Sequence, residues 1–186
     1  MWLRPFRPAD SAQILAIYGP IIANSSATFE VEVPSLSNFT KRLTHIAERF
    51  PFWVVESAQE EILAYAYGTT HRERVAYQWA VETSVYVAPD HCGKGLGRVL
   101  LEALHASLAE RGFVWSYGVI TLPNPASLAL LNSMDYNFFA TYHAAGQKFG
   151  RWYDVQWARF ALRPAEPGMA APRFQGLSLD ERVEVR

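Results

Sequence analysis

The chain has 186 residues, half of them hydrophobic and 14% aromatic, which suits one domain with a sizeable core better than two domains. It has 17 basic and 18 acidic side chains and a formal net charge of −1. This balance argues against a nucleic acid or an anionic membrane surface as a partner.

The first third of the chain predicts a short strand and two helices. The strand covers residues 2–6, and a helix opens at residues 8–10, where Asp10 and Gln13 have the spacing of a capping pair. The apolar positions of this helix share one face: Ile14, Ile17, Tyr18, Ile21 and Ile22. A second amphipathic helix ends near Arg49, and its apolar face consists of Leu36, Phe39, Leu43 and Ile46.

A hairpin and a long strand come next. Residues 52–56 and 62–68 are strand candidates on either side of a polar turn, and a charged connector runs over residues 71–74. The long strand covers residues 77–87. Because side chains alternate between the two faces of a strand, Glu82 shares a face with Ser84 and Tyr86, opposite Thr83, Val85 and Val87.

A glycine-rich loop separates this strand from a helix predicted over residues 98–111. Its glycines are Gly93, Gly95 and Gly97, which allow backbone amides to approach a ligand and to adopt positive φ. The N-terminus of the helix adds a partial positive charge at the same place. The loop therefore indicates a phosphate or pyrophosphate site. The spacing is neither the dinucleotide fingerprint nor a P-loop, so a glycine-rich turn without a ligand is the alternative.

The helix after the loop leads into a further strand and a short helix. The buried side of the first helix consists of Leu100, Leu101, Leu104 and Leu108, and Gly112 ends it. Residues 113–120 form an apolar strand of the kind that is buried on both faces. Residues 121–125 interrupt that strand and start a short helix, which continues to Met134.

The last part of the chain predicts a closing pair of strands and a tail. The strands cover residues 138–142 and 152–162, and the intervening segment is a connector. Beyond Arg163 the sequence is rich in Pro, Ala and Gly and has little apolar periodicity. We therefore expect one domain over residues 1–163 and a tail over residues 164–186.

The cysteine and the histidines indicate which cellular compartment and which metal sites are to be expected. Cys92 is the single cysteine and cannot form an intrachain disulfide, which fits a reducing cytoplasm. The chain shows neither a signal peptide's apolar segment nor a run long enough to span a bilayer. No metal-ligand spacing relates Cys92 to the histidines at positions 45, 71, 91 and 105. We expect a cytoplasmic protein with no metal and no membrane association.

The order of these elements, with the glycine loop in its middle, resembles the GNAT superfamily of acetyl-CoA-dependent N-acyltransferases. The family's loop has the form Arg/Gln-x-x-Gly-x-Gly/Ala, and residues 92–97 read Cys-Gly-Lys-Gly-Leu-Gly. Residues 76–87, 122–124 and 144–155 are similar to the corresponding segments of phosphinothricin N-acetyltransferases. The resemblance extends from residue 2 to about residue 162 and does not include the tail.

The resemblance implies an α/β fold of the GNAT type, in which about four helices flank a mixed, mostly antiparallel sheet of about seven strands. It implies acetyl-CoA as co-substrate, with the pyrophosphate on the glycine loop and the pantetheine beside the preceding strand. The residues implied to bind acetyl-CoA are Val85, Tyr86, Val87, Gly93, Lys94, Gly95, Leu96, Gly97, Arg98 and Asn124. A homodimer is also implied.

The resemblance further implies roles for residues on the acceptor side. An amine attacks a thioester only as the neutral base, and Glu82 is implied to remove its proton. Arg72 and Arg74 are implied to hold the acceptor's carboxylate, for which a guanidinium is well suited. Thr28 and Phe29 are implied to shape the acceptor pocket. From the residues alone, Glu82 also fits an exposed strand position, the arginines a solvated loop, and Phe29 a core position.

The sequence departs from the family pattern in three places. Cys92 stands where the loop usually begins with Arg or Gln, and Leu131 stands where a Tyr or His can protonate the leaving thiolate. Asp135 and Tyr136 replace the Gly-Phe/Tyr pair that usually ends the short helix, and Asp tolerates the left-handed conformation of that turn.

The expected activity is acetyl transfer to the amino group of a small amino acid or analogue, of the phosphinothricin, methionine sulfoximine or methionine sulfone type. Two alternatives stay open: N-acetylation of a peptide or protein, and an acyl-CoA-binding sensor without turnover. Leu131 and Cys92 suit the sensor, whereas Glu82 argues against it. Arg72 and Arg74 favour an acceptor with a free carboxylate over a peptide.

Overall fold

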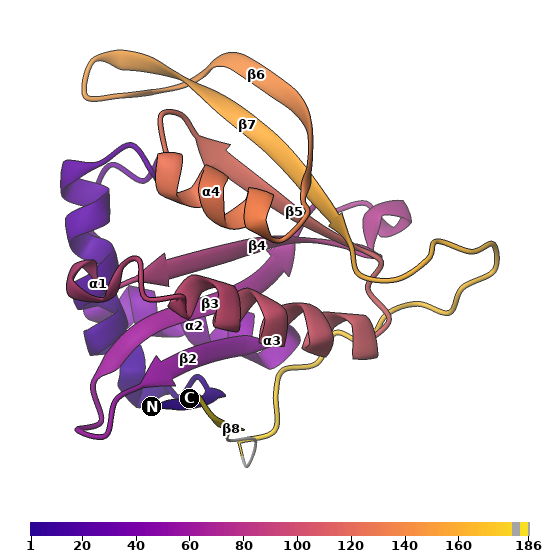
Figure 1. Cartoon of the computed structure of the whole chain (residues 1–186), viewed down its shortest axis with the longest axis horizontal. Helices are drawn as coiled ribbons and strands as arrows, with labels where there is room; N and C mark the ends of the chain where they lie inside the picture. The colour runs from indigo at the N-terminus through magenta and orange to yellow at the C-terminus, as the bar shows by residue number, and fades with distance from the viewer. Residues whose placement is uncertain (180–182, 186) are drawn as a thin grey trace.

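The computed structural model describes residues 1–179 and 183–185 and contains one mixed sheet with helices on both faces (Figure 1). In these residues the sheet has eight strands in the order β6-β7-β5-β4-β3-β2-β1-β8. The strands are β1 Trp2–Pro5, β2 Phe52–Glu56, β3 Ile62–Thr70, β4 Ala80–Val87, β5 Trp115–Thr121, β6 Asn137–Lys148, β7 Arg151–Ala161 and β8 Val183–Glu184. All neighbours are antiparallel except β4 and β5. The expected mixed, mostly antiparallel sheet is confirmed, and the two-residue β8 is the additional strand.

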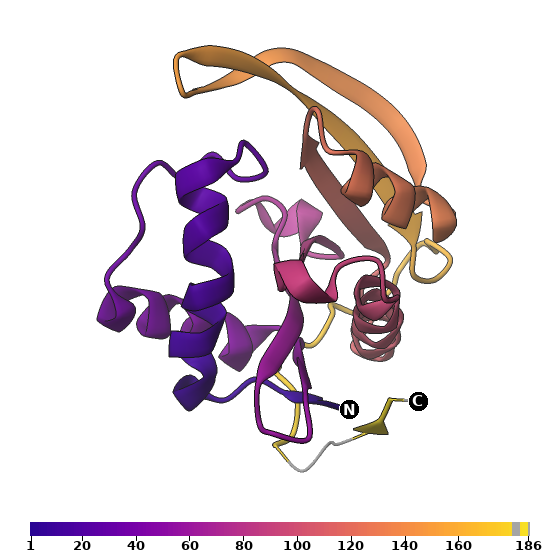
Figure 2. The same cartoon turned by 60° about the vertical axis from the view of Figure 1, so that its left-hand side comes forward.

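Helices cover both faces of the sheet. Those of the described residues are α1 Ser11–Asn24, α2 Leu36–Arg49, α3 Leu96–Glu110 and α4 Pro125–Ser133. Figure 2 shows α1 and α2 on one side of the sheet and α3 and α4 on the other. Ile14, Phe39 and Tyr65 belong to the apolar cluster under α1 and α2, and Leu100 and Leu104 to the cluster under α3. Burial of each such side chain stabilises the fold by about 1.5–3 kcal/mol, so the two clusters hold the sheet between them.

The predicted capping pair of the first helix is wrong. The Asp10 carboxylate accepts hydrogen bonds from Arg4 Nη1 and Nη2 at 2.8 and 2.9 Å, and Arg4 Nε donates to Glu56 Oε1 at 2.9 Å. Gln13 instead accepts from the Ile62 backbone N–H at 2.9 Å. A buried guanidinium without a partner costs several kcal/mol. The carboxylate of Asp10 therefore neutralises the Arg4 guanidinium of β1 rather than capping α1.

Three strand assignments differ from the prediction. β4 begins at Ala80, later than expected, because residues 75–77 form a 3-10 turn. β5 is not buried on both faces, since Val119 is 39% exposed. β6 continues to Lys148 instead of giving way to a connector, because the irregular pairing after Tyr142 accommodates the extra residues as a bulge.

Residues 164–179 of the tail lie along the surface of the domain. The Arg173 backbone N–H donates to Arg111 O, just past the end of α3, at 2.8 Å. The ring of Phe174 packs edge-on against Phe50, with 5.6 Å between the ring centroids. Farther along the tail, β8 pairs with β1 and so lies beside the first strand of the chain (Figure 1). The tail thus extends the packing of the core, and the domain boundary at residue 163 stays a prediction.

A buried polar chain crosses the α3 side of the sheet. The Tyr136 hydroxyl lies 2.7 Å from His105 Nε2 and 2.8 Å from Ser116 Oγ, which in turn lies 3.1 Å from Thr83 Oγ1. The His105 ring stacks on Phe160 at 4.6 Å. Burial lowers the pKa of His105 to about 4, because a charged imidazole would lose its hydration there. His105 is therefore neutral at pH 7.

We expect His105 to make the protein lose stability as the pH falls below 6.5. Its pKa in the folded state, about 4, lies below the unfolded value of about 6.5, so the unfolded chain takes up the proton first. The free energy of unfolding should fall by about 1.4 kcal/mol per pH unit between these values. His105→Gln keeps a donor near Nε2 but does not titrate. Denaturant unfolding should show a smaller decrease in the free energy of unfolding between pH 7 and pH 5 for this variant than for the wild type. Equal decreases would contradict the assignment.

Candidate active site

The parallel strands β4 and β5 pair only over their first residues. The pairing starts at Ala80 and Trp115 and ends at Glu82 and Tyr117. Beyond this point the strands fan apart toward their C-terminal ends (Figure 1). The gap between residues 83–87 and 118–121, which we call the wedge, opens the sheet at its centre between α3 and α4.

Backbone groups of β4 are directed into the wedge. The Ala88 N–H donates to Leu63 O in β3 at 2.8 Å, and the hydrogen bonds of an antiparallel pair alternate along the strand. The backbone N–H and C=O groups of Val85 and Val87 therefore point away from β3 and toward the gap. An extended ligand in the wedge can bond to these groups as an added strand would.

The glycine loop and the first turn of α3 close one end of the wedge. Gly93 and Gly95 have φ of +75° and +83°, and an added Cβ on either would meet no protein atom within 4 Å. Gly95 is the N-cap residue of α3 and leaves the first N–H groups of the helix uncovered by a capping side chain. These groups and the positive end of the helix dipole suit an anion.

The wedge contains a cavity of about 730 Å³. The predicted acetyl-CoA residues that line it are Val85, Tyr86, Val87, Gly93, Gly95, Leu96, Gly97, Arg98 and Asn124. Lys94 is exposed and does not line it. The guanidinium of Arg98 donates to Glu102 Oε1 at 2.8 Å and to Ser133 O at 3.0 Å, which ties α3 to the end of α4. Contact of these residues with acetyl-CoA stays a prediction.

Two glycines bring α4 close to the wedge. A Cβ on Gly97 would lie 3.0 Å from Leu130 Cδ2, so the absence of a side chain sets the spacing of α3 and α4. A Cβ on Gly118 would overlap Leu131, whose side chain is 7% exposed and lines the cavity. The position expected to hold a proton donor in relatives is therefore an apolar side chain packed on β5.

Glu82 lies at the apex of the wedge, where the pairing of β4 with β5 ends. Its Oε1 is 3.0 Å from His71 Nδ1, and Thr69 Oγ1 donates to its backbone oxygen at 3.4 Å. The Glu82 side chain is 31% exposed, so its carboxylate is accessible to a small molecule. The Glu82 carboxylate is thus both accessible and hydrogen-bonded to His71.

The two arginines expected to hold a carboxylate lie on the connector that follows β3. Both are exposed. The Arg72 guanidinium carbon lies 5.9 Å from the ring centre of Trp157 in β7, and Arg74 precedes the 3-10 turn at residues 75–77. The structure thus places Arg72 beside Trp157 of β7, on the connector that also contains His71.

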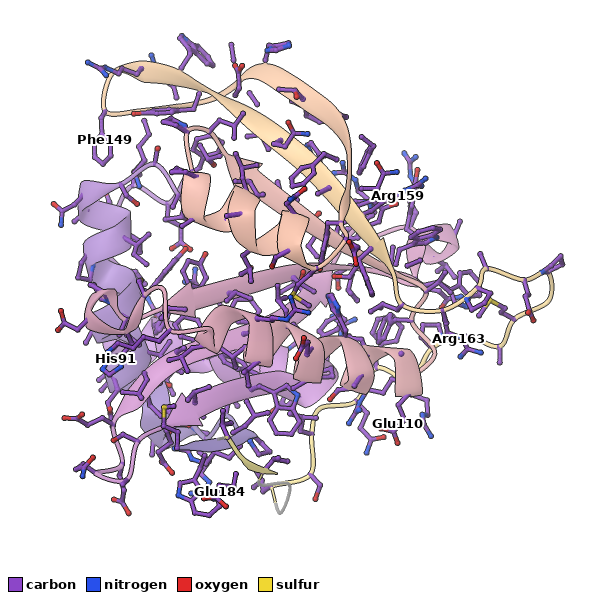
Figure 3. All side chains as sticks on the ribbon, in the orientation of Figure 1. His91, Glu110, Phe149, Arg159, Arg163 and Glu184 are labelled. Atoms are coloured by element: carbon purple, nitrogen blue, oxygen red, sulfur yellow. The ribbon has the colours of Figure 1, made fainter. Side chains whose placement is uncertain are left out.

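Thr28 and Phe29 belong to a contact between the α1–α2 loop and the β6–β7 hairpin. Lys148 Nζ, in a residue that is 3% exposed, donates to Thr28 O at 2.9 Å. The Phe29 ring lies against Gly146, where an added Cβ would overlap it. Figure 3 shows Phe149 at the tip of the hairpin, near α1. Thr28 and Phe29 therefore join two elements beside the wedge, but neither lines its cavity.

Comparison with known proteins identifies the family. Residues 3–157 match the acetyltransferase (GNAT) domain. The chain belongs to the GNAT acetyltransferase family. It is 34% identical to a phosphinothricin N-acetyltransferase from Streptomyces viridochromogenes, over 93% of this chain and 94% of the relative. It is 33% identical to an L-methionine sulfoximine/L-methionine sulfone acetyltransferase from Pseudomonas aeruginosa, over 84% of this chain and 91% of the relative.

A solved structure extends the comparison to the fold. A phosphinothricin acetyltransferase from Sinorhizobium meliloti in complex with AcCoA superposes with a TM-score of 0.84 at 31% identity. The match covers 90% of this chain and 94% of the other. The predicted GNAT fold and the resemblance to phosphinothricin N-acetyltransferases are confirmed.

As a GNAT acetyltransferase the protein uses acetyl-CoA, and the wedge fits this co-substrate. An extended pantetheine arm suits the backbone groups of Val85 and Val87, and a pyrophosphate suits the uncovered N–H groups after Gly95. Within residues 1–179 and 183–185, no group of three His, Cys, Asp or Glu side chains is arranged to hold a metal ion. Over the same residues, no helix has both the length and the apolar character of a membrane span.

The contact between His71 and Glu82 was missed by the sequence analysis, which considered His71 only as a metal ligand. A usable signal was present. Continuing the alternation of β3 from Tyr65 and Tyr67 through Thr69 reaches residue 71 on the face that also holds Glu82. The packing of Leu131 on β5 had no such signal, because it depends on how α4 folds back over the sheet.

We expect Gly95→Ala to weaken acetyl-CoA binding without unfolding the protein. The new Cβ meets no protein atom but occupies the space before the α3 N-terminus, so the Kd should rise about tenfold or more. Gly168→Ala is the matched control, because Gly168 also has a positive φ, +74°, and open surroundings but lies in the tail. Calorimetric titration compares the two, and an unchanged Kd for folded Gly95→Ala would exclude a pyrophosphate at this helix end.

Proposed function

We propose that the protein transfers the acetyl group of acetyl-CoA directly to the amino group of a small amino acid or analogue, with Glu82 as general base. The acceptor is of the phosphinothricin, methionine sulfoximine or methionine sulfone type. The position of Glu82 at the apex of the wedge carries this proposal, because a pantetheine arm that followed β4 inward from the glycine loop would lead toward it. The two relatives named for acetylation of such analogues support the acceptor class.

The groups around the apex divide the chemical work. Acetyl-CoA supplies an activated thioester. Glu82 takes the proton of the acceptor's ammonium group, since only the neutral amine attacks. The Val85 N–H, which points into the wedge, stabilises the negative charge that develops on the thioester oxygen. The alternation of hydrogen bonds along β4 favours Val85 over Tyr86 for this role, because the Tyr86 N–H faces β3.

The departing thiolate receives no proton from Leu131, whose side chain is apolar and packed against Gly118. A free thiol has a pKa of about 8.5, so its anion is a good leaving group near neutral pH. An acid at this position therefore contributes less to the reaction than the base does. This difference favours an active enzyme over the sensor without turnover.

Arg72 and Arg74 bind the carboxylate of the acceptor in this proposal. Both guanidinium groups are exposed on the connector that begins with His71, the residue bonded to Glu82. A guanidinium binds a carboxylate with two parallel hydrogen bonds, which orients the acceptor as well as holding it. Thr28 and Phe29 form the border of the acceptor pocket on the side of the α1–α2 loop.

We also propose that the protein is a homodimer and acts in the cytoplasm. β6 is the last strand of the sheet, and large aromatic side chains are exposed on β6 and β7: Phe139 at 47%, Tyr142 at 51% and Trp152 at 64%. An exposed apolar surface next to a free strand edge is typical of a contact between subunits. The exposed thiol of Cys92 suits a reducing compartment.

A thiol-release assay with acetyl-CoA tests the acceptor class. The panel contains free amino acids, phosphinothricin, methionine sulfoximine, methionine sulfone and short peptides. Release with the free amino-acid analogues and not with peptides is the expected result. Preference for peptides would favour peptide or protein N-acetylation, and tight binding of acetyl-CoA without release for any amine would favour the sensor.

We expect a dimer in sedimentation equilibrium at micromolar concentration. Trp152→Ser should shift the equilibrium toward the monomer, because it removes the most exposed aromatic side chain of the β6–β7 surface. Val75→Ser, at an exposed apolar residue of the 3-10 turn, is the comparison variant. A wild-type protein that sediments as a monomer would refute the dimer.

We expect Glu82→Gln to reduce turnover about 100-fold or more, in line with the usual contribution of a general base. Glutamine keeps the shape and the hydrogen-bonding capacity but cannot take the proton. The deficit should shrink at high pH, where the amine loses its proton unaided, and the Kd for acetyl-CoA should not change because Glu82 does not line the cavity. Glu73→Gln, at an exposed acid of the same connector, is the control. Near-normal turnover of Glu82→Gln at pH 7 would exclude Glu82 as the base.

A further inference from the structure

We propose that His71 is a positioning residue for Glu82: its imidazole holds one carboxylate oxygen so that the other faces the acceptor amine. This inference rests on the proposed function, in which Glu82 is the general base. His71 is not among the residues that the family resemblance implied for the site, and it acts here through Glu82 rather than on the substrate.

The hydrogen bond defines which oxygen is held. His71 Nδ1 lies 3.0 Å from Glu82 Oε1, and because an ionised carboxylate only accepts hydrogen bonds, Nδ1 is the nitrogen that bears the hydrogen. In the part of the chain that the structure describes, Oε2 of Glu82 has no hydrogen-bond partner. With Oε1 occupied and the side chain 31% exposed, Oε2 is the oxygen available to an amine.

Aromatic side chains fix the imidazole itself. The ring stacks on Tyr117 with 4.4 Å between centroids and 10° between planes. Tyr77 and Trp157 meet the same ring edge-on, at 6.0 and 5.9 Å. The His71 side chain is 10% exposed. A ring held on several sides cannot rotate away, so the Nδ1–H direction is set before any acceptor arrives.

The backbone of the base is fixed from the same side. Thr69 pairs with Glu82 across β3 and β4, and Thr69 Oγ1 donates to the Glu82 backbone oxygen at 3.4 Å. His71 follows two residues later on the same face and reaches the carboxylate. Backbone and side chain of Glu82 are thus both oriented by the end of β3. A displacement of about 1 Å in a catalytic group can reduce the rate about 100-fold, which makes such orientation functionally significant.

The test separates the hydrogen bond from the stacking. His71→Phe keeps a flat ring between Tyr117 and Trp157 but removes the donor. His71→Asn removes the ring but retains an N–H near the place of Nδ1. Each is measured for kcat, KM for acetyl-CoA and thermal unfolding, alone and combined with Glu82→Gln, using the best acceptor of the panel.

We expect His71→Phe to lower kcat about 10- to 100-fold while the KM for acetyl-CoA stays within about twofold. His71→Asn should recover most of this loss. In the Glu82→Gln background, His71→Phe should cause no further loss, because the carboxylate that it orients is gone. Should His71→Phe lower the melting temperature, the recovery in His71→Asn and the absence of a further loss still distinguish orientation from stability.

The outcomes that overturn the inference differ from those that overturn the function. If Glu82→Gln loses turnover while His71→Phe retains it, His71 does not position the base, and the proposed function stands. Equal losses from His71→Phe with and without the Glu82 carboxylate, or no recovery in His71→Asn, would also overturn the positioning role. If Glu82→Gln itself keeps full turnover, the base assignment fails and the role of His71 fails with it.

Discussion

The early end of the pairing between β4 and β5 is the constraint on which the site depends. Two parallel strands that stayed paired would satisfy each other's backbone groups and leave a continuous sheet. Here the pairing stops at Glu82 and Tyr117. The same separation leaves the backbone groups of Val85 without a partner strand, creates room for an elongated ligand and leaves Glu82 at its apex. Binding and chemistry therefore arise from a single interruption of regular structure.

The helices on the α3 side keep the gap open and shaped. Gly97 lets α3 and α4 come close, and Gly118 lets Leu131 lie directly on β5. Arg98 ties the start of α3 to the carbonyl oxygen of Ser133 at the end of α4. A larger residue at either glycine would push α4 outward. The two glycines thus set the width of the wedge, and the hydrogen bond from Arg98 helps to hold α4 in place.

The parts of the fold that follow from local patterns could be predicted from the sequence. The amphipathic face of α2 and the face of β4 that holds Glu82 follow from periods that can be counted along the chain, and the glycine loop follows from its residue types. What could not be predicted depends on contacts between distant segments. Asp10 resembles a helix cap until Arg4 is brought beside it. The continuation of β6 past Tyr142 requires a bulge opposite β7, and the packing of the tail requires the surface of a folded domain.

The structure provides different numbers of polar contacts on the leaving-group side and on the acceptor side of the reaction. On the leaving-group side lies Leu131, a buried apolar residue whose side chain has no proton to donate. On the acceptor side Glu82 is held through its backbone by Thr69 and through its carboxylate by His71. The thiolate of acetyl-CoA is stable enough to leave near neutral pH, whereas an ammonium group cannot attack at all until it loses a proton. The acceptor side is therefore where structure contributes most to the rate, and it is there that this chain places its fixed polar contacts.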